Sequence, residues 1–281
     1  MNEYLYEIPS LFIALGLLVS MLLAMELGYR IGLRRKEVTS EVSKEHINAI
    51  QGSILGILAL LIGFTFSLSL QRYDTRTDAV IEEANAISTA YMRIQLLPAA
   101  LQKAARDTMR EYIDLRVITS HLAMTNHEER NNQLARTAEL QAKLWDYARQ
   151  GIEVDPNMYP PTMFAESVNG LIEHFRTRNA ALDNHVPELV LLLLHGTLLM
   201  SGAIVGFSTG VAGHRPSLVT HVMVLLIVVL VFIIIDLDRP RRGFIRVSQA
   251  SLIELQSSIH AQMDAISTQT VPKASPVPIR K

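Results

Sequence analysis

The sequence predicts an all-α membrane protein with four transmembrane helices and a helical-bundle extramembrane domain between the second and third spans. Two observations predict this class. Apolar residues make up 49% of the chain and charged residues 19%, which is too apolar for one soluble domain and too polar for an entirely membrane-embedded chain. The apolar residues also form long runs near both ends, so the polar middle is expected to lie outside the bilayer.

Four apolar runs are long enough to cross a bilayer, because a spanning helix needs about 20 apolar residues. The first runs from Ile8 to about Gly28, and the second from Ile47 to Gln71. The third runs from Leu189 to Gly213, and the fourth from Ser217 to Ile235. The segment before the first run carries no Lys or Arg, so we expect a retained helix there and not a signal peptide.

The runs divide the chain into four predicted parts: spans one and two (1–71), a helical extramembrane domain (72–185), spans three and four (186–238), and a C-terminal amphipathic segment with a disordered tail (239–281). No Gly or Pro occurs between Arg72 and Leu97. This predicts one long helix that leaves the membrane and ends at Pro98.

Glycines recur at four-residue spacing in the spans, namely Gly28/Gly32, Gly52/Gly56 and Gly202/Gly206/Gly210. Small residues at this spacing allow helices to approach closely in lipid. They predict tight packing, either within one subunit or between subunits.

Glu26 in the first span and His195 in the third are ionisable residues, which are energetically costly inside a membrane. Glu26 is one turn from Arg30 and is expected to pair with it, and His195 is expected to bond a backbone carbonyl. The alternative is that these intramembrane polar residues belong to a permeation or proton path.

One face of the second span changes from apolar through hydroxyl to cationic, because its residues step by three or four positions. The pore-lining candidates of this segment are Ile62, Thr65, Phe66, Ser69, Arg72 and Arg76. In a ring of subunits they would form an apolar neck that opens into a positive vestibule; arginine rings favour anions, and apolar constrictions gate by dewetting. The alternative is that the two arginines only anchor the end of the helix.

The segment after the fourth span, DLDRPRRGFIR, alternates acidic and basic residues, and Pro240 and Gly243 make the chain turn. It predicts an ion-pair corner at the membrane exit, with the candidate residues Glu82, Glu83, Asp236, Asp238, Arg239, Arg241 and Arg242. The alternative is binding of an anionic lipid headgroup or ligand.

Several short stretches together resemble the bestrophin-like family of bacterial membrane proteins: GFTF and RYD within residues 63–74, EANAI at 83–87, LLP at 96–98, HVP at 185–187 and DLDRPRRG at 236–243. The resemblance implies a pentameric channel for anions or cations, whose second membrane helix lines the pore with an apolar neck. It also implies a bacterial inner (plasma) membrane location, with the domain between spans two and three in the cytoplasm. The chain lacks the tryptophan pair of bacterial bestrophins and the acidic cluster that binds calcium in animal ones, so calcium gating is not expected.

We therefore predict an oligomeric, anion-conducting bestrophin-like channel with the second span lining the pore. Its expected partners are further copies of the chain, membrane lipids and a permeant inorganic ion. No phosphate loop, GxSxG, HExxH or basic aromatic-rich motif occurs, so we expect no enzyme, cofactor, metal site or nucleic-acid binding. The alternative is a non-conducting membrane scaffold or sensor whose helical domain binds a partner. A lipid-modifying enzyme would have to use Asp236 and Asp238 with His174 or His185.

Overall fold

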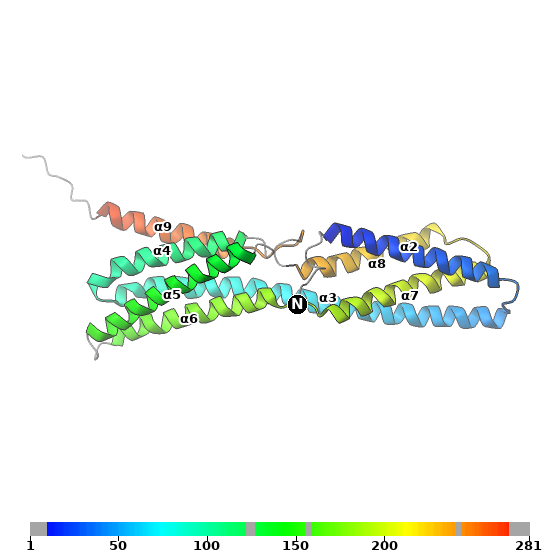
Figure 1. The fold of residues 1–281 in the computed structure, drawn as a ribbon, viewed down its shortest axis with the longest axis horizontal. Coiled ribbons are helices and arrows are strands. Elements are labelled where there is room, and N and C mark those ends of the chain that lie inside the picture. Colours follow the sequence, from blue (N-terminus) through cyan, green and yellow to red (C-terminus); the bar gives the residue numbers. More distant parts are fainter. Residues whose placement is uncertain (1–9, 122–126, 155–158, 240–242, 270–281) are drawn as a thin grey trace, which may run out of the picture. The chain divides into compact units, whose positions relative to one another are not determined.

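The computed structural model describes residues 10–121, 127–154, 159–239 and 243–269, and within them every regular element is a helix (Figure 1). The all-α class predicted from the sequence is confirmed. The helices are α2 (Ser10–Arg35), α3 (Glu41–Arg93), η1 (Ile94–Leu96), α4 (Ala99–His121), α5 (His127–Val154), α6 (Tyr159–Asp183), α7 (Glu188–Ala212), α8 (Leu218–Leu237) and α9 (Ala250–Gln269).

The chain divides into two compact units, which we describe separately. The membrane unit comprises Met1–Arg76 and Ala181–Val247, and the helical unit comprises Thr77–Ala180 and Ser248–Lys281. α3 is one continuous helix that contributes to both units, as the absence of helix breakers predicts. It ends in the short turn η1, after which Leu97 adopts an extended backbone, the conformation favoured for a residue before proline.

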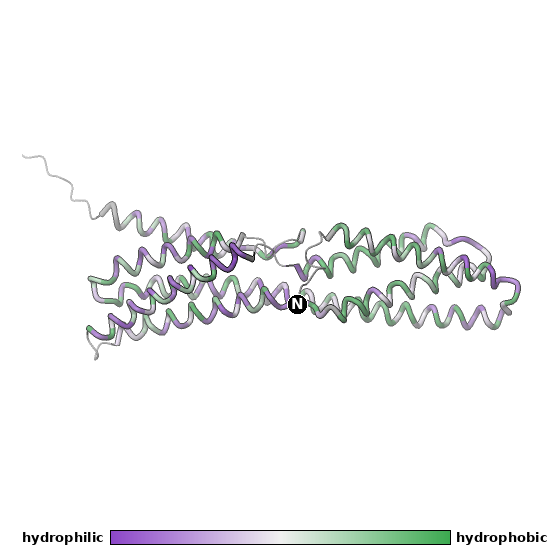
Figure 2. The backbone as a smooth tube through the Cα atoms, in the orientation of Figure 1, coloured by the Kyte–Doolittle hydropathy of each residue, from purple (hydrophilic) through white to green (hydrophobic). Residues whose placement is uncertain are grey.

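Four helices of the described chain are long and apolar enough to cross a membrane, which confirms the four predicted spans. They are Leu11–Arg35, Glu41–Leu96, Leu189–Ala212 and Leu218–Leu237. Figure 2 shows apolar residues prevailing along α8 and along the part of α3 in the membrane unit, whereas α5 is mostly polar. The chain is therefore a multi-pass membrane protein.

The core of the membrane unit is built by all four spanning helices. Its buried side chains are Leu17, Met21 and Met25 of α2, Leu58 and Ile62 of α3, Leu194, Leu198 and Val205 of α7, and Val224, Val228, Val231 and Ile234 of α8. Hydrophobic burial does not drive helix association in lipid, so close packing must hold these helices together.

α2 and α7 pack at backbone contact through the glycines noted in the sequence. A Cβ atom on Gly206 would lie 1.9 Å from the carbonyl oxygen of Met25, and one on Gly28 would lie 2.0 Å from that of Ala203. These glycines thus serve packing within one chain. Gly52 and Gly56 differ, because a Cβ on either meets no atom of the described chain within 4 Å.

The helical unit packs α4, α5, α6, α9 and the second part of α3 around side chains such as Ile87, Tyr112, Leu144 and Phe164, each with no exposed surface. Within the predicted C-terminal amphipathic segment, the helix α9 begins at Ala250. It is tied to α4 through one carboxylate oxygen of Asp114, which lies 2.7 Å from Gln256 Nε2 and 2.8 Å from His260 Nε2. The predicted disordered tail lies mostly beyond the described residues.

Candidate functional site

Arg76 is the last residue of α3 that belongs to the membrane unit, and it is only 2% exposed. Its guanidinium donates hydrogen bonds to the carbonyl oxygens of Asn184 (2.7 Å), Ala181 (3.1 Å) and Leu237 (3.2 Å). These carbonyls lie at the C-terminal ends of α6 and α8, where a helix has unsatisfied acceptors and a partial negative charge. Arg76 therefore caps two helix ends at once.

Asp238 follows α8 and faces two cations of α3. Its Oδ1 lies 3.7 Å from Nη2 of Arg76 and 3.8 Å from Nη1 of Arg72, and its Oδ2 accepts a hydrogen bond from the backbone of Val186 at 2.9 Å. The carboxylate is 2% exposed. Arg72, Arg76 and Asp238 thus join α3, the start of the third span and the end of the fourth.

Asp236 fixes the turn that follows. Its Oδ2 accepts a hydrogen bond from the backbone nitrogen of Ile245 at 2.9 Å. A Cβ atom on Gly243 would lie 2.8 Å from both carboxylate oxygens, so only glycine leaves room for this contact. The four residues Arg72, Arg76, Asp236 and Asp238 form what we call the membrane-exit cluster. Arg239, which directly follows Asp238 in the sequence, is also buried. Arg241 and Arg242 lie outside the described residues.

Glu82 and Glu83, which we expected at this corner, have partners in the helical unit instead. Glu83 is fully buried, and its Oε1 accepts a hydrogen bond from Arg116 Nε at 2.6 Å, while Oε2 pairs with Arg178. Glu82 is about half exposed and lies 3.5 Å from His174. The prediction that Glu83 belongs to the membrane-exit corner was wrong, because two nearer arginines neutralise it.

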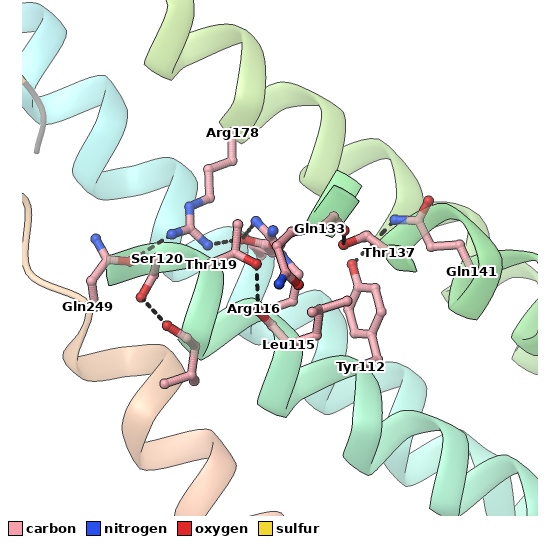
Figure 3. A network of polar contacts seen from close by, with 12 residues as sticks. Tyr112, Leu115, Arg116, Thr119, Ser120, Gln133, Thr137, Gln141, Arg178 and Gln249 are labelled. Carbon is pink, nitrogen blue, oxygen red and sulfur yellow. Dashed lines mark hydrogen bonds and ion pairs between the residues drawn. The ribbon is translucent and has the colours of Figure 1, made fainter. Parts of the chain in front are cut away.

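The two arginines that pair with Glu83 belong to a buried polar network, and Figure 3 shows Arg116 and Arg178 within it. Arg178 also donates to Gln249 at 2.7 Å, and the Arg116 guanidinium lies 4.6 Å from the centroid of the Phe175 ring. Burial, reinforced by the Glu83 carboxylate, raises the pKa of the Tyr112 hydroxyl well above its usual range, so this group stays neutral. A network with this burial fixes the helices of the unit. Sequence analysis missed both arginines; their one signal is that they continue the apolar stripes of α4 and α6.

The face of α3 that we predicted to line a pore is buried inside its own chain. Ile62 is 9% exposed, Thr65 3% and Ser69 0%, and Arg76 is capped as described above. Thr65 donates to the carbonyls of its own helix. Side chains that pack against the subunit's other helices cannot line a pore between subunits, so this set is corrected. Of the predicted set, Phe66 is 36% exposed and Arg72 is partly exposed.

The opposite side of α3 is open along the spanning segment. Its residues step by four and three positions, and each of them is exposed. We call them the outer face of α3: Ser53, Ile57, Leu60, Phe64, Ser67 and Gln71. Ile57 is 54% exposed, Leu60 63% and Phe64 67%. A spanning helix with serine and glutamine on its open side is unusual for a surface that meets only lipid.

The two intramembrane polar residues lie in different surroundings. Glu26 accepts a hydrogen bond from Arg30 Nε at 2.8 Å, which agrees with the pairing expected from their spacing. His195 is partly buried on α7, and its bond to a carbonyl stays a prediction.

Comparison with known proteins gives two matches. The bestrophin-like domain family matches residues 13–252. The crystal structure of a variant of a bacterial bestrophin homolog from Klebsiella pneumoniae matches with a TM-score of 0.58 and 16% identity, over 89% of this chain and 99% of that one. The curated proteins give no match. The structural likeness supports the fold, and the domain match covers most of the sequence. The chain therefore belongs to the bestrophin-like family.

Proposed function

We propose that the chain forms a homo-oligomeric ion channel in the bacterial inner membrane, whose pore is lined by the outer face of α3. The observation that carries the proposal is this open, partly polar face on a spanning helix whose other side is packed within its own chain. A second supporting observation is the glycine pair Gly52 and Gly56, which leaves α3 free for close contact with another copy. By analogy with bestrophins, the oligomer is a pentamer with its helical unit in the cytoplasm.

The outer face of α3 has the grading that a gated pore needs. Ile57, Leu60 and Phe64 present apolar side chains over about two turns, and Ser67 and Gln71 follow with polar ones. A ring of such helices would make an apolar neck that can exclude water, next to a hydrated segment that admits ions. The neck we propose is of the same kind as the one predicted from the sequence, but on the other side of α3.

The new placement also changes the expected ion. The arginines that suggested anions are held in the membrane-exit cluster, and the outer-face series continues past Gln71 with the exposed Asp74 and Asp78. Rings of carboxylates favour cations. We therefore propose a cation-selective channel in place of the anion channel expected from Arg72 and Arg76.

The test is ion flux into liposomes that contain the purified protein, with potassium and chloride compared at equal concentrations. We expect potassium flux to exceed chloride flux. The double variant Asp74→Asn/Asp78→Asn should lower the potassium preference, because an ion within about 4 Å of a carboxylate in water gains about 1 kcal/mol, or roughly a fivefold difference.

The matched control is Asp107→Asn, which removes an exposed carboxylate on α4 outside the outer-face series. It should leave the ion preference unchanged. Chloride flux above potassium flux would overturn the cation proposal. Absence of flux for both ions, in protein that elutes as one oligomer, would favour the scaffold or sensor over the channel.

A further inference from the structure

We propose that a cavity in the membrane unit, between α2 and the turn that joins α7 to α8, binds a phospholipid with an ammonium headgroup of the phosphatidylethanolamine class. This inference concerns a site other than the pore and does not depend on conduction. It rests on the apolar wall of the cavity, on the charges at its polar end, and on the contacts that hold those charges in place.

The cavity has a volume of about 440 Å³. This lies in the range of roughly 300–1,000 Å³ that is usual for ligand sites. One wall is an apolar strip of α2, in which Val19 and Leu23 are exposed, Leu22 is partly exposed and the core residue Met25 lies at the base. These residues belong to a spanning segment, so the wall lies where lipid acyl chains are available. An acyl chain along the strip would cover apolar surface that the protein itself leaves open.

The other end of the cavity is polar and carries Glu26, Arg215 and His221. Arg215 follows α7, and its guanidinium lies 5.8 Å from the centroid of the Tyr29 ring, a cation–π contact that keeps the cation near the cavity. The His221 Nδ1 lies 2.9 Å from the carbonyl oxygen of Ser217, the residue that caps the N-terminus of α8. With the proton on Nδ1, the ring donates a hydrogen bond to that carbonyl, which orients it.

The charges at the polar end complement a zwitterionic headgroup. Arginine binds phosphate through two parallel N–H donors, so Arg215 is the expected phosphate ligand. Glu26 can accept hydrogen bonds from an ammonium group, because its exposed partner Arg30 donates to Oε1 and not to the second carboxylate oxygen, Oε2. A trimethylammonium headgroup has no N–H to donate, and a glycerol headgroup has no cation. The site therefore prefers ethanolamine over choline and glycerol.

The experiment measures lipids retained by the purified full-length protein, by mass spectrometry under non-denaturing conditions. The protein is delipidated in detergent and titrated with phosphatidylethanolamine, phosphatidylcholine or phosphatidylglycerol that carry the same acyl chains. We expect the ethanolamine lipid to bind most tightly. Arg215→Gln should weaken binding of all three lipids by about tenfold, since it removes a charge-assisted hydrogen bond. Glu26→Gln should abolish the ethanolamine preference and leave the glycerol lipid unaffected.

The matched control is Arg35→Gln, which removes an exposed arginine from the same helix outside the cavity lining. It should bind all three lipids as the unmodified protein does. A second variant, Val19→Trp, fills the apolar strip without a change of charge and should lower lipid retention at an unchanged elution volume. O-phosphoethanolamine, the headgroup without acyl chains, should not compete.

Three results would overturn the proposal. One is equal binding of the three lipids to the unmodified protein. Another is a loss in Arg35→Gln as large as that in Arg215→Gln, which would mean a general charge effect. The third is full competition by O-phosphoethanolamine, which would assign the polar end to a soluble compound.

Discussion

Replacement of Glu83 with alanine should destabilise the helical unit by about 3–5 kcal/mol, the usual cost of breaking a buried ion pair. The side chains of Arg116 and Arg178 are each 2% exposed, and both pair with this carboxylate. Without it, two buried cations would remain with no counter-charge between them. The effect should appear as a lower denaturant midpoint in the fluorescence of Trp145, which is the chain's one tryptophan and lies in α5.

The control for this variant is the neighbouring residue. Glu82→Ala removes the same group from a side chain that is 55% exposed, so its effect should stay within about 1 kcal/mol. The triple variant with leucine at Glu83, Arg116 and Arg178 should recover much of the loss, because no unpaired charge is left. Equal effects of the two single alanine variants would show that the buried network does not hold the unit together.

Replacement of Gly206 with valine should disrupt the membrane unit at the crossing of α2 and α7. The added Cβ atom would lie 1.9 Å from the carbonyl oxygen of Met25 and 2.7 Å from its carbonyl carbon, so the two helices would have to separate. Overpacking against backbone, which cannot rotate away, is expected to cost about 3 kcal/mol or more. The expected result is loss of the monodisperse peak in detergent, or a much lower midpoint of thermal unfolding.

Gly196→Val is the matched control on the same helix. A Cβ atom at Gly196 meets no atom of the described chain within 4 Å, so this variant should purify and unfold like the unmodified protein. Disruption by both variants would mean that α7 tolerates no β-branched residue, independent of its contact with α2. Tolerance of both would contradict the close α2–α7 packing.

The four spans and the long helix α3 could be predicted from the sequence. The length of an apolar run and the absence of Gly or Pro can both be read from one stretch of residues. The outward side of α3 could not be predicted in the same way. In lipid, apolar residues suit both the packed and the open side, so Ile62 and Leu60 look alike in the sequence. Thr65 and Ser69 also look like pore residues, yet a buried hydroxyl can be satisfied by its own helix, as Thr65 is.

The partners of the charged residues depend on contacts that no local pattern encodes. Glu83 pairs with Arg116 and Arg178, which lie 33 and 95 positions away in the sequence. The densest group of cations in the sequence is the one after the fourth span, so the sequence favoured it as the partner of Glu83. Arg76 likewise binds backbone carbonyls of two helix ends, and such carbonyls leave no signal in the amino-acid sequence.

The side of α3 that faces the pore is tested most directly by two serines two positions apart. The chain contains no cysteine, so a single introduced thiol is the one reactive site. Ser67 lies on the outer face of α3, and Ser69 is fully buried on the opposite side. In liposomes, a charged methanethiosulfonate reagent should block potassium flux through Ser67→Cys and leave Ser69→Cys unaffected. Block of Ser69→Cys with Ser67→Cys unaffected would contradict this account and return the pore to the face first expected from the sequence.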